Sequence, residues 1–400
     1  MTNSESPMMK FAQRLQPLRR NVFADMDSAK AKAKAAGKEI IDLSLGSSDL
    51  PAGNHVLDTI KESLYDPSTH GYPLFHSTQP FRKAVADWFE KKYGVAVDPE
   101  TEVLPLIGCQ EGTAHLPLAL LDPGDTALLQ DPSYPSHSGG IHLAGGEIYW
   151  LPTLAENQFL PVFADIPPEV REKAQMMVLS YPHNPTTALA PLSFFEEAVQ
   201  FCQENEIALV HDFPYGDMVF SGSPPAPSVL QADRNKEIAI EFFTFSKSYN
   251  MGGFRIAFAV GNQDLILGLR QVKAVVDFNQ YKGILNGAIA ALTGPQESIQ
   301  QTVDTFEYRR DVFVNALNRI GWEVSKPKAT LYLWAKLPQS WQGNAMDFGT
   351  QLVEATGVAV APGSGFGKAG EGYVRMALVR DADKLEEAAQ KIAQFLDRAC

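Results

Sequence analysis

The chain has few cysteines, no long apolar run and a shortage of positive charge. Only three of its 400 residues are cysteine, namely Cys109, Cys202 and Cys400. Such a sparse, odd set is not typical of a disulfide framework and favours a reducing compartment. No apolar run approaches the ~20 residues of a membrane-spanning helix. The polar segment 1–10 also lacks the charge-then-apolar order of a signal peptide. We therefore expect a cytoplasmic protein with no membrane partner.

Acidic residues outnumber basic ones by 47 to 34, so the formal net charge is −13. Nucleic acids bind proteins through clustered Lys and Arg, and we therefore expect no nucleic-acid partner. A small anionic ligand is still compatible, because one site can be positive on an acidic surface. A chain of 400 residues is long for a single hydrophobic core, which favours two packed units.

The middle of the chain alternates short apolar runs with amphipathic helical patterns. This alternation indicates an α/β fold with a mostly parallel sheet of seven strands, covered by helices on both faces. The runs are Val103–Ile107, Thr126–Leu129, Glu147–Leu151, Met176–Ser180, Ile207–Val210, Glu241–Phe245 and Arg255–Val260.

The last hundred residues have a different pattern. A long helical pattern starts near Gln296, two strand-like segments follow at 330–335 and 373–378, and a final helix contains Leu385 and Ile392. This order predicts a second, smaller α+β domain. We therefore predict an N-terminal arm with part of the small domain at 1–47, a large domain at 48–290 and a small C-terminal domain at 291–400.

Polar loops rich in glycine and proline follow five of the apolar runs. In open α/β sheets, ligands bind outside the carboxyl ends of the strands. Taken singly, each loop also has an ordinary structural explanation. Asp212 could cap a helix, Asn184 before a proline could form a turn, Tyr134 could be a packed aromatic, and the segment 108–112 could be a tight turn.

Lys247 is harder to explain in this way. The segment from Phe245 to Phe254 is apolar on both sides, and burying a charge there is costly. A lysine in such surroundings can act as a nucleophile toward carbonyl groups. Arg255 follows eight residues later, after two glycines, and its forked cation suits a phosphate. A reactive lysine, a carboxylate and a phosphate site are what a pyridoxal phosphate enzyme needs.

At these residues the sequence closely resembles the class I/II aminotransferases of the fold-type I pyridoxal phosphate superfamily. The resemblance runs from about Ile40 to Arg380. Its most specific motif is Ser-Lys-Ser-Tyr-Asn-Met at 246–251 followed by Arg255, which is similar to the Schiff-base lysine signature. Asn-Pro-Thr at 184–186 is similarly placed. The resemblance implies pyridoxal 5′-phosphate as the cofactor, and no metal.

The resemblance also implies roles for the residues around the cofactor ring. Lys247 would carry the cofactor and then move the proton at the substrate α-carbon. Asp212 would pair with the protonated ring nitrogen, since charge from the substrate spreads into the ring only while that nitrogen keeps its proton. Asn184 and Tyr215 would hydrogen-bond the phenolate oxygen, and Tyr134 would stack on the ring.

For the cofactor phosphate, the resemblance implies a group of hydroxyls, amides and one cation. These are the side chains of Thr244, Ser246 and Arg255 together with the backbone amides of Cys109 and Gln110. Free amides at the start of a helix suit a phosphate because they point outward and carry partial positive charge.

Three further residues are implied to act on the substrate or on a second subunit. Arg375 resembles the arginine that binds the substrate α-carboxylate, with Asn184 beside it, and Gly46 would add a backbone amide. Tyr72 resembles the tyrosine that reaches the phosphate of the neighbouring subunit's cofactor. The resemblance therefore implies a homodimer with shared sites, acting on an amino acid and a 2-oxo acid.

Three positions depart from the glycine that is frequent in the family, namely Ser77, Thr187 and Ala257. Ala257 is a mild change inside a strand, whereas Thr187 is less permissive of positive φ. Ser77 lies in the loop after Tyr72, so it affects substrate choice more than activity.

The segments 99–115, 168–185 and 246–260 are most similar to LL-diaminopimelate aminotransferases, with 2-oxoglutarate as the acceptor. Three other functions stay open. The first is aspartate aminotransferase, and the second is a pyridoxal phosphate C–S β-lyase, because a fold does not fix the reaction. The third is a non-catalytic cofactor-binding regulator, which is disfavoured because the chain lacks a basic DNA-binding segment.

Overall fold

The computed structural model describes residue 9 and the ranges 11–19 and 22–399. Most of segment 1–10 and Cys400, both considered above, lie outside the described residues. Within the described ranges, seven strands form the large sheet in the order β2-β8-β7-β6-β5-β3-β4. In that order they are Val103–Leu106, Ala257–Gly261, Ala239–Thr244, Ala208–Asp212, Ala174–Leu179, Thr126–Asp131 and Glu147–Pro152.

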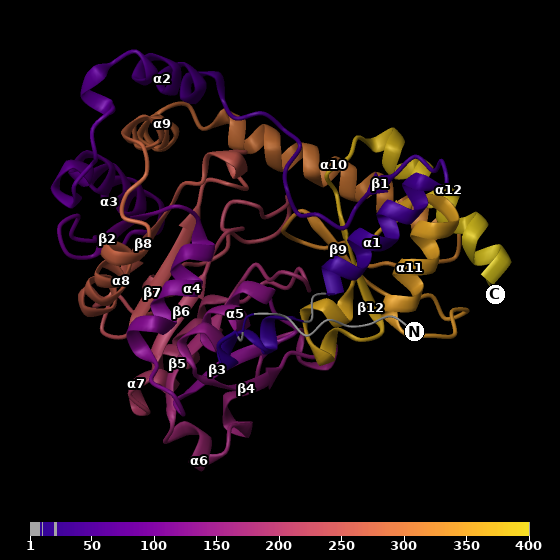
Figure 1. Ribbon diagram of the computed structural model, residues 1–400, viewed down its shortest axis with the longest axis horizontal. Coiled ribbons are helices and arrows are strands. Elements are labelled where there is room, and N and C mark those ends of the chain that lie inside the picture. Colours follow the sequence, from indigo (N-terminus) through magenta and orange to yellow (C-terminus); the bar gives the residue numbers. More distant parts are fainter. Residues whose placement is uncertain (1–8, 10, 20–21, 400) are drawn as a thin grey trace.

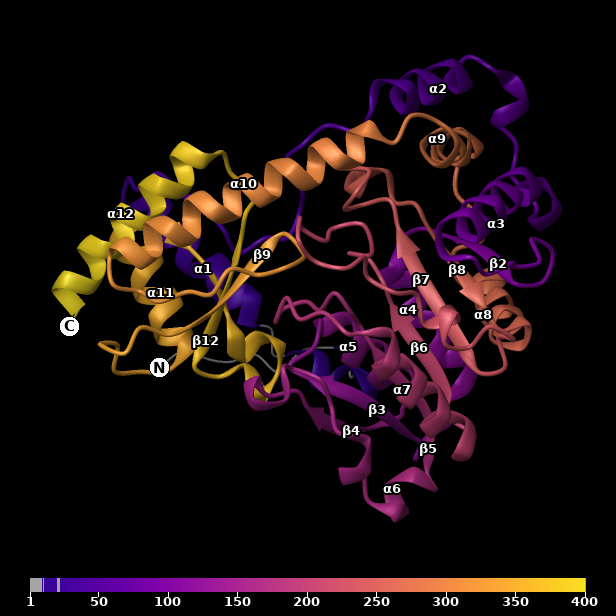
Figure 2. The same cartoon turned by 180° about the vertical axis from the view of Figure 1, so that it is seen from behind.

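The large sheet is mostly parallel, as predicted. Strands β7, β6, β5, β3 and β4 run parallel, and β8 alone is antiparallel to its two neighbours. Each of the seven predicted apolar runs overlaps one of these strands. The parallel strands therefore bring their carboxyl ends to one edge, where the polar loops gather (Figure 2).

Helices cover both faces of this sheet, which explains why its strands are apolar throughout. Alternate side chains of a strand point to opposite faces, so Leu128 joins one core cluster while Ala127 and Leu129 join another. The first cluster includes residues of α2 (Asn54–Leu64), α3 (Gln79–Tyr93), α7 (Leu192–Glu204) and α9 (Lys282–Thr293). The other includes residues of α4 (Cys109–Leu120), α5 (Pro135–Ala144) and α8 (Gln263–Val276). A short helix, α6 (Pro168–Arg171), precedes β5.

A third core cluster belongs to the remaining elements. The long helix α10 (Glu297–Arg319) leads into it and packs against α12 (Ala382–Ala399), as Figure 1 shows. The antiparallel order here is β11-β12-β9, with strands Ala361–Pro362, Tyr373–Ala377 and Tyr332–Lys336. The N-terminal helix α1 (Val22–Ala35) packs on α11 (Ala345–Thr356), and β1 (Ile41–Asp42) pairs with β10 (Val358–Ala359).

The N-terminal arm thus lies with the C-terminal elements, because Ile41 and Leu43 belong to the same core cluster as Phe313 and Leu385. The predicted division at 47/48 and 290/291 stays a prediction. None of the helices in the described part of the chain is long and apolar enough to cross a membrane.

Candidate functional site

One cavity of about 420 Å³ opens at the carboxyl ends of the parallel strands, between the large sheet and β12. Every site residue predicted from the sequence lines this cavity, with the exception of Tyr72. They are Gly46, Cys109, Gln110, Tyr134, Asn184, Asp212, Tyr215, Thr244, Ser246, Lys247, Arg255 and Arg375. These residues come from many separate segments, which only the strand order brings together.

Lys247 lies in the turn that follows β7, so its side chain reaches into the cavity from the sheet edge. Its Nζ atom donates a hydrogen bond of 2.6 Å to the carbonyl oxygen of Gly46. The same atom lies 5.6 Å from the centre of the Tyr215 ring. Lys247 is therefore an amine held inside a cavity and not a solvated loop lysine.

Asp212 is the last residue of β6 and is buried beside a histidine. Its Oδ2 atom lies 2.9 Å from Nε2 of His137, which is also buried. Its Oδ1 atom is buried and has no hydrogen-bond partner within the described part of the chain. A turn and not a helix follows β6, so the helix-cap explanation of Asp212 is wrong. The result is a buried carboxylate with one open oxygen.

His137 was missed by the sequence reasoning. It lies in the first turn of α5, three residues after Tyr134, and contacts that ring edge-on at a centroid distance of 5.9 Å. The only signal in the sequence was its place after a strand and a Ser-Tyr-Pro turn, where a helix start is expected. That signal does not reveal a partner 75 residues away.

The start of α4 and the loop before β8 form a cationic corner of the cavity. Gly108 precedes α4 with φ of 136°, a conformation that side chains rarely adopt. A Cβ atom there would also overlap the end of the Arg255 side chain, so another residue would strain the backbone and displace the guanidinium. Nearby, Thr244 donates to Ser246 through their hydroxyls at 2.9 Å. Burial, together with the charge of Asp212, raises the pKa of the Cys109 thiol, so this thiol stays protonated.

Arg375 comes from the middle of β12 and reaches across to the large sheet. Its Nη1 atom donates to Oδ1 of Asn184 at 2.8 Å, and its Nη2 atom donates to the carbonyl oxygen of Ser44 at 2.7 Å. Its guanidinium lies over the rings of Tyr332 at 4.3 Å and Phe366 at 4.7 Å. A planar, buried cation of this kind suits bidentate binding of a carboxylate.

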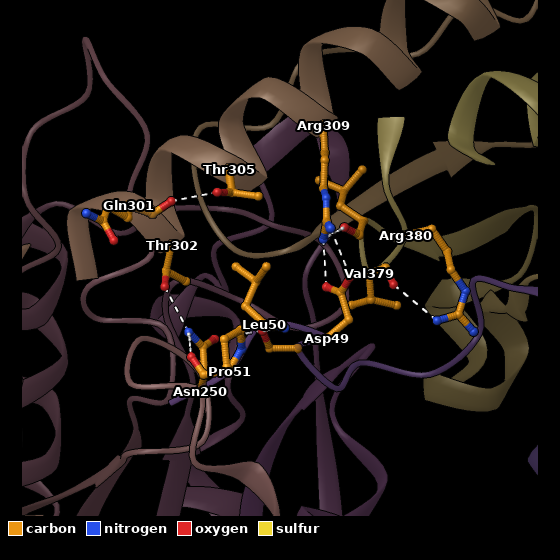
Figure 3. A network of polar contacts seen from close by, with 12 residues as sticks. Asp49, Leu50, Pro51, Asn250, Gln301, Thr302, Thr305, Arg309, Val379 and Arg380 are labelled. Carbon is orange, nitrogen blue, oxygen red and sulfur yellow. Dashed lines mark hydrogen bonds and ion pairs between the residues drawn. The ribbon is translucent and has the colours of Figure 1, made fainter. Parts of the chain in front are cut away.

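The connecting segment 47–51 lies between β1 and α2 in the chain, and Figure 3 shows its Asp49 beside Arg309 of α10. Both oxygens of Asp49 accept from Arg309 on α10, at 2.6 and 2.8 Å. The side chain of Asn250 accepts from Ser48 at 2.7 Å and donates to Thr302 at 2.9 Å. The loop that carries Lys247 is therefore tied to this segment and to α10.

Tyr72 does not reach the cavity of its own chain. Its side chain is 89% exposed and contacts Phe278 edge-on at 6.4 Å. Leu74, Val275 and Val276 are also exposed. Ser77 does not line the cavity either, since it lies in a short helical turn at Phe75–Thr78.

Thr187 adopts a φ of 63° although it is β-branched. Its amide donates to the carbonyl oxygen of His183 at 2.8 Å, which closes the turn that carries Asn184. The turn that glycine would form without strain is thus formed by threonine as well. Ala257 lies buried in β8, in keeping with a mild change.

Taken together, the cavity offers an amine, a carboxylate with an open oxygen and two guanidinium groups. It can hold a molecule that has an aromatic ring at its centre, a phosphate group at one end and a carboxylate group at the other. The amine of Lys247 would face the reacting atom of that molecule. This arrangement belongs to amine and carbonyl chemistry.

Comparisons with known proteins agree with this chemistry. Residues 38–392 match the family model described as aminotransferase class I and II. An LL-diaminopimelate aminotransferase of Dehalococcoides mccartyi is 43% identical over 98% of this chain and 100% of its own length. One of Moorella thermoacetica is 40% identical over 98% and 99%. The structure of a probable N-succinyldiaminopimelate aminotransferase from Thermus thermophilus is 42% identical, with a TM-score of 0.88 over 94% of this chain and all of that one.

Proposed function

The chain belongs to the class I and II aminotransferase family, and we propose that it transfers an amino group from LL-diaminopimelate to 2-oxoglutarate, with pyridoxal 5′-phosphate bound at Lys247. The observation that carries the choice of donor is the 39–43% identity, over nearly the whole chain, to several LL-diaminopimelate aminotransferases. As an aminotransferase, the protein acts on an amino acid and a 2-oxo acid.

The residues in the cavity fit pyridoxal 5′-phosphate. The open, buried Oδ1 atom of Asp212 needs a donor, and a protonated ring nitrogen would be one. The start of α4, Arg255 and the hydroxyls of Thr244 and Ser246 suit a phosphate dianion. Tyr134 lines the same cavity and has a face available for stacking.

The cofactor, when bound, supplies a carbonyl carbon that links to amines and a ring that takes up electrons from the substrate α-carbon. Lys247 supplies the amine for that link. As a free amine, its Nζ atom would accept the proton released from the substrate α-carbon and hold it until it is returned. His137 holds Asp212 in place through their 2.9 Å contact, and Asp212 would keep the ring nitrogen of the bound cofactor protonated.

Arg375 and Asn184 orient the substrate. The 2.8 Å contact between them fixes the plane of the guanidinium, which would hold the α-carboxylate through two parallel hydrogen bonds. The amide of Gly46 would add a third donor. With its carboxylate fixed in this way, the substrate would present its α-hydrogen to Lys247. Less entropy is then lost in reaching the reactive geometry.

The function is tested by adding single amino donors to the purified protein with pyridoxal 5′-phosphate and following the visible absorption of the bound cofactor. LL-diaminopimelate should replace the cofactor's visible absorption band by that of its aminated form. Addition of 2-oxoglutarate should then restore the first band and yield glutamate. Conversion by aspartate or N-succinyl-LL-diaminopimelate, but not by LL-diaminopimelate, would replace the proposed donor. Release of pyruvate and ammonia from cystathionine with no conversion would favour a lyase.

The exposed position of Tyr72 supports a homodimer with shared sites, in which Tyr72 reaches the partner's phosphate. Mixing the variants Tyr72→Phe and Lys247→Ala tests this directly. Random reassortment restores one intact site in half of the dimers, so about a quarter of wild-type activity should return. No recovery on mixing, with subunit exchange shown independently, would place both residues in one chain's own site or remove Tyr72 from it.

The compartment that we propose is the cytoplasm. In its favour, Cys109 and Cys202 are both free and buried in the described part of the chain. Fractionation of cells that produce the protein, with a cytoplasmic enzyme as the marker, checks this placement.

A further inference from the structure

Tyr332 lines the cavity, although its place in the sequence indicated no role. It is the first residue of β9 and is 2% exposed. Its hydroxyl oxygen lies 2.8 Å from that of Tyr215, and the two rings meet edge-on at a centroid distance of 5.7 Å. Each hydroxyl of such a buried pair has the other as its specific partner and has little freedom to rotate away from it.

Two further groups of the site rest against Tyr332. The guanidinium of Arg375 lies 4.3 Å above its ring, which is a favourable place for a cation. A Cβ atom added at Gly46 would overlap the Tyr332 hydroxyl, so the backbone of Gly46 lies directly against it. Tyr332 therefore touches a group on the cofactor side, Tyr215, and two groups on the substrate side.

The 2.8 Å separation allows either hydroxyl of the pair to donate. Burial acts to raise the pKa of Tyr332, but the charges of Arg375 and Lys247, together with the hydrogen bond with Tyr215, outweigh it, and the pKa lies below its ordinary value. Burial, together with the neighbouring Tyr332, raises the pKa of Tyr215 well above its ordinary value. A pair in which Tyr332 donates leaves the Tyr215 proton free for a second acceptor in the cavity.

We propose that Tyr332 is a positioning residue, whose hydroxyl donates to Tyr215 so that the Tyr215 proton points to the cofactor, and whose ring fixes the plane of Arg375 for the substrate carboxylate. A hydroxyl has one proton and two acceptor positions. When Tyr215 accepts from Tyr332, its own proton stays free, and the chain of two hydrogen bonds polarises it. This inference rests on the proposed cofactor, but not on the identity of the amino donor.

The first test is the variant Tyr332→Phe, which removes the hydroxyl and keeps the ring. In the protein loaded with pyridoxal 5′-phosphate, the pH midpoint of the cofactor's visible absorption change should rise by up to about one pH unit, because one hydrogen bond is involved. The KM for the amino donor should change less than twofold, since Arg375 keeps its ring. A midpoint equal to that of the wild type overturns the proposal. A fall in the midpoint overturns the assigned direction of the bond.

The second test separates the ring from the hydroxyl. Tyr332→Leu should raise KM for the amino donor roughly thirtyfold, which corresponds to the about 2 kcal/mol expected for a desolvated cation–π contact. In a Tyr215→Phe background, Tyr332→Phe should leave the midpoint unchanged, because the coupling passes through Tyr215. An equal shift in both backgrounds would mean a general structural effect and would overturn the proposal.

The control is Tyr373→Phe, which changes a tyrosine of the same small sheet that stacks on Trp334. It should leave both the midpoint and KM at wild-type values. A wild-type protein with no cofactor band would overturn the proposed function and this inference with it. Failure of LL-diaminopimelate as donor would leave the midpoint experiment intact.

Discussion

The carboxylate of Asp49 and the guanidinium of Arg309 form a bidentate ion pair, with oxygen–nitrogen distances of 2.6 and 2.8 Å. Arg309 also donates to the carbonyl oxygen of Leu378, just after β12, at 3.1 Å. One arginine on α10 thus holds both the connecting segment and the strand that carries Arg375. The contact thus joins the segment after Gly46 to the end of the strand that carries Arg375.

Arg309→Lys should lower the free energy of unfolding by about 1–3 kcal/mol, because a lysine cannot form the two parallel bonds and leaves a half-buried carboxylate poorly paired. Denaturant unfolding measures this change. The matched control is Arg319→Lys, whose pair with Glu386 is exposed on both sides and should contribute at most about 1 kcal/mol. Equal effects of the two variants would contradict the importance of the pair between Asp49 and the buried Arg309.

Lys247→Ala should lower kcat by at least about a thousandfold, since the proton transfer at the substrate α-carbon loses its base. The cofactor should still bind, because Asp212 and the residues that bind the cofactor's phosphate remain. Activity assays and the spectrum of the dialysed protein check the two parts separately. Lys61→Ala, on the exposed surface of α2, is the control and should behave as the wild type. Substantial turnover by Lys247→Ala would remove Lys247 from the mechanism.

Asp212→Asn should lower kcat by roughly a hundredfold or more, because a neutral amide no longer stabilises the proton on the cofactor ring. His137→Phe should lower it less, by about tenfold, since it only orients Asp212 through their 2.9 Å contact. The double variant should be no worse than Asp212→Asn alone. Additive losses would mean that His137 acts on the substrate by itself.

Thr187→Gly should stabilise the fold by about 0.5–1 kcal/mol. Threonine at φ of 63° is strained, and glycine relieves this strain, although it also gains entropy in the unfolded chain. Thr305→Gly in the helix α10 is the control and should destabilise by up to about 1 kcal/mol. A destabilised Thr187→Gly variant would show that the threonine side chain contributes more than its backbone strain.

Stability should fall in acid partly because of His183. Burial, with a smaller contribution from the charge of His137, lowers the pKa of His183 from 6.5 to about 3. Between these two pH values the unfolded chain binds a proton that the folded one does not, so stability is lost as the pH falls from 6.5. The slope from this group is about 1.4 kcal/mol per pH unit. Denaturant unfolding between pH 6.5 and 4.5 should show a shallower slope for His183→Asn; parallel slopes would mean that His183 is protonated in the fold.

The sheet could be predicted from the sequence because its strands are apolar on both faces and separated by turns. The pairing of β1 with β10, two residues each, could not be predicted, because its backbone bonds leave no periodic pattern. The site was predictable where one loop carried several chemical groups, as around Lys247. His137 and Tyr332 were not, since a lone histidine in a helix and a lone tyrosine in a strand have no local signature. Their partners lie 75 and 117 residues away.

The resemblance to a family, and not the residue pattern, indicated Arg375. By pattern alone it would be a strand-end surface arginine, whereas the structure buries it to 4% exposure. Burial of a cation depends on what two distant segments place around it, here Asn184 and the carbonyl of Ser44. Such an environment is a property of the fold and cannot be deduced from one strand.

The pairing of β1 with β10 has a consequence for the order in which the protein is made. Ile41 pairs with Val358, so the first strand waits for a partner synthesised roughly 300 residues later, which takes tens of seconds at ordinary rates of translation. Until then the N-terminal arm has no strand to dock on. Contacts so distant in sequence also slow folding. Proteases should therefore cleave nascent chains within the N-terminal arm first. The arm should become resistant to proteolysis only when the ribosome has released the final helix.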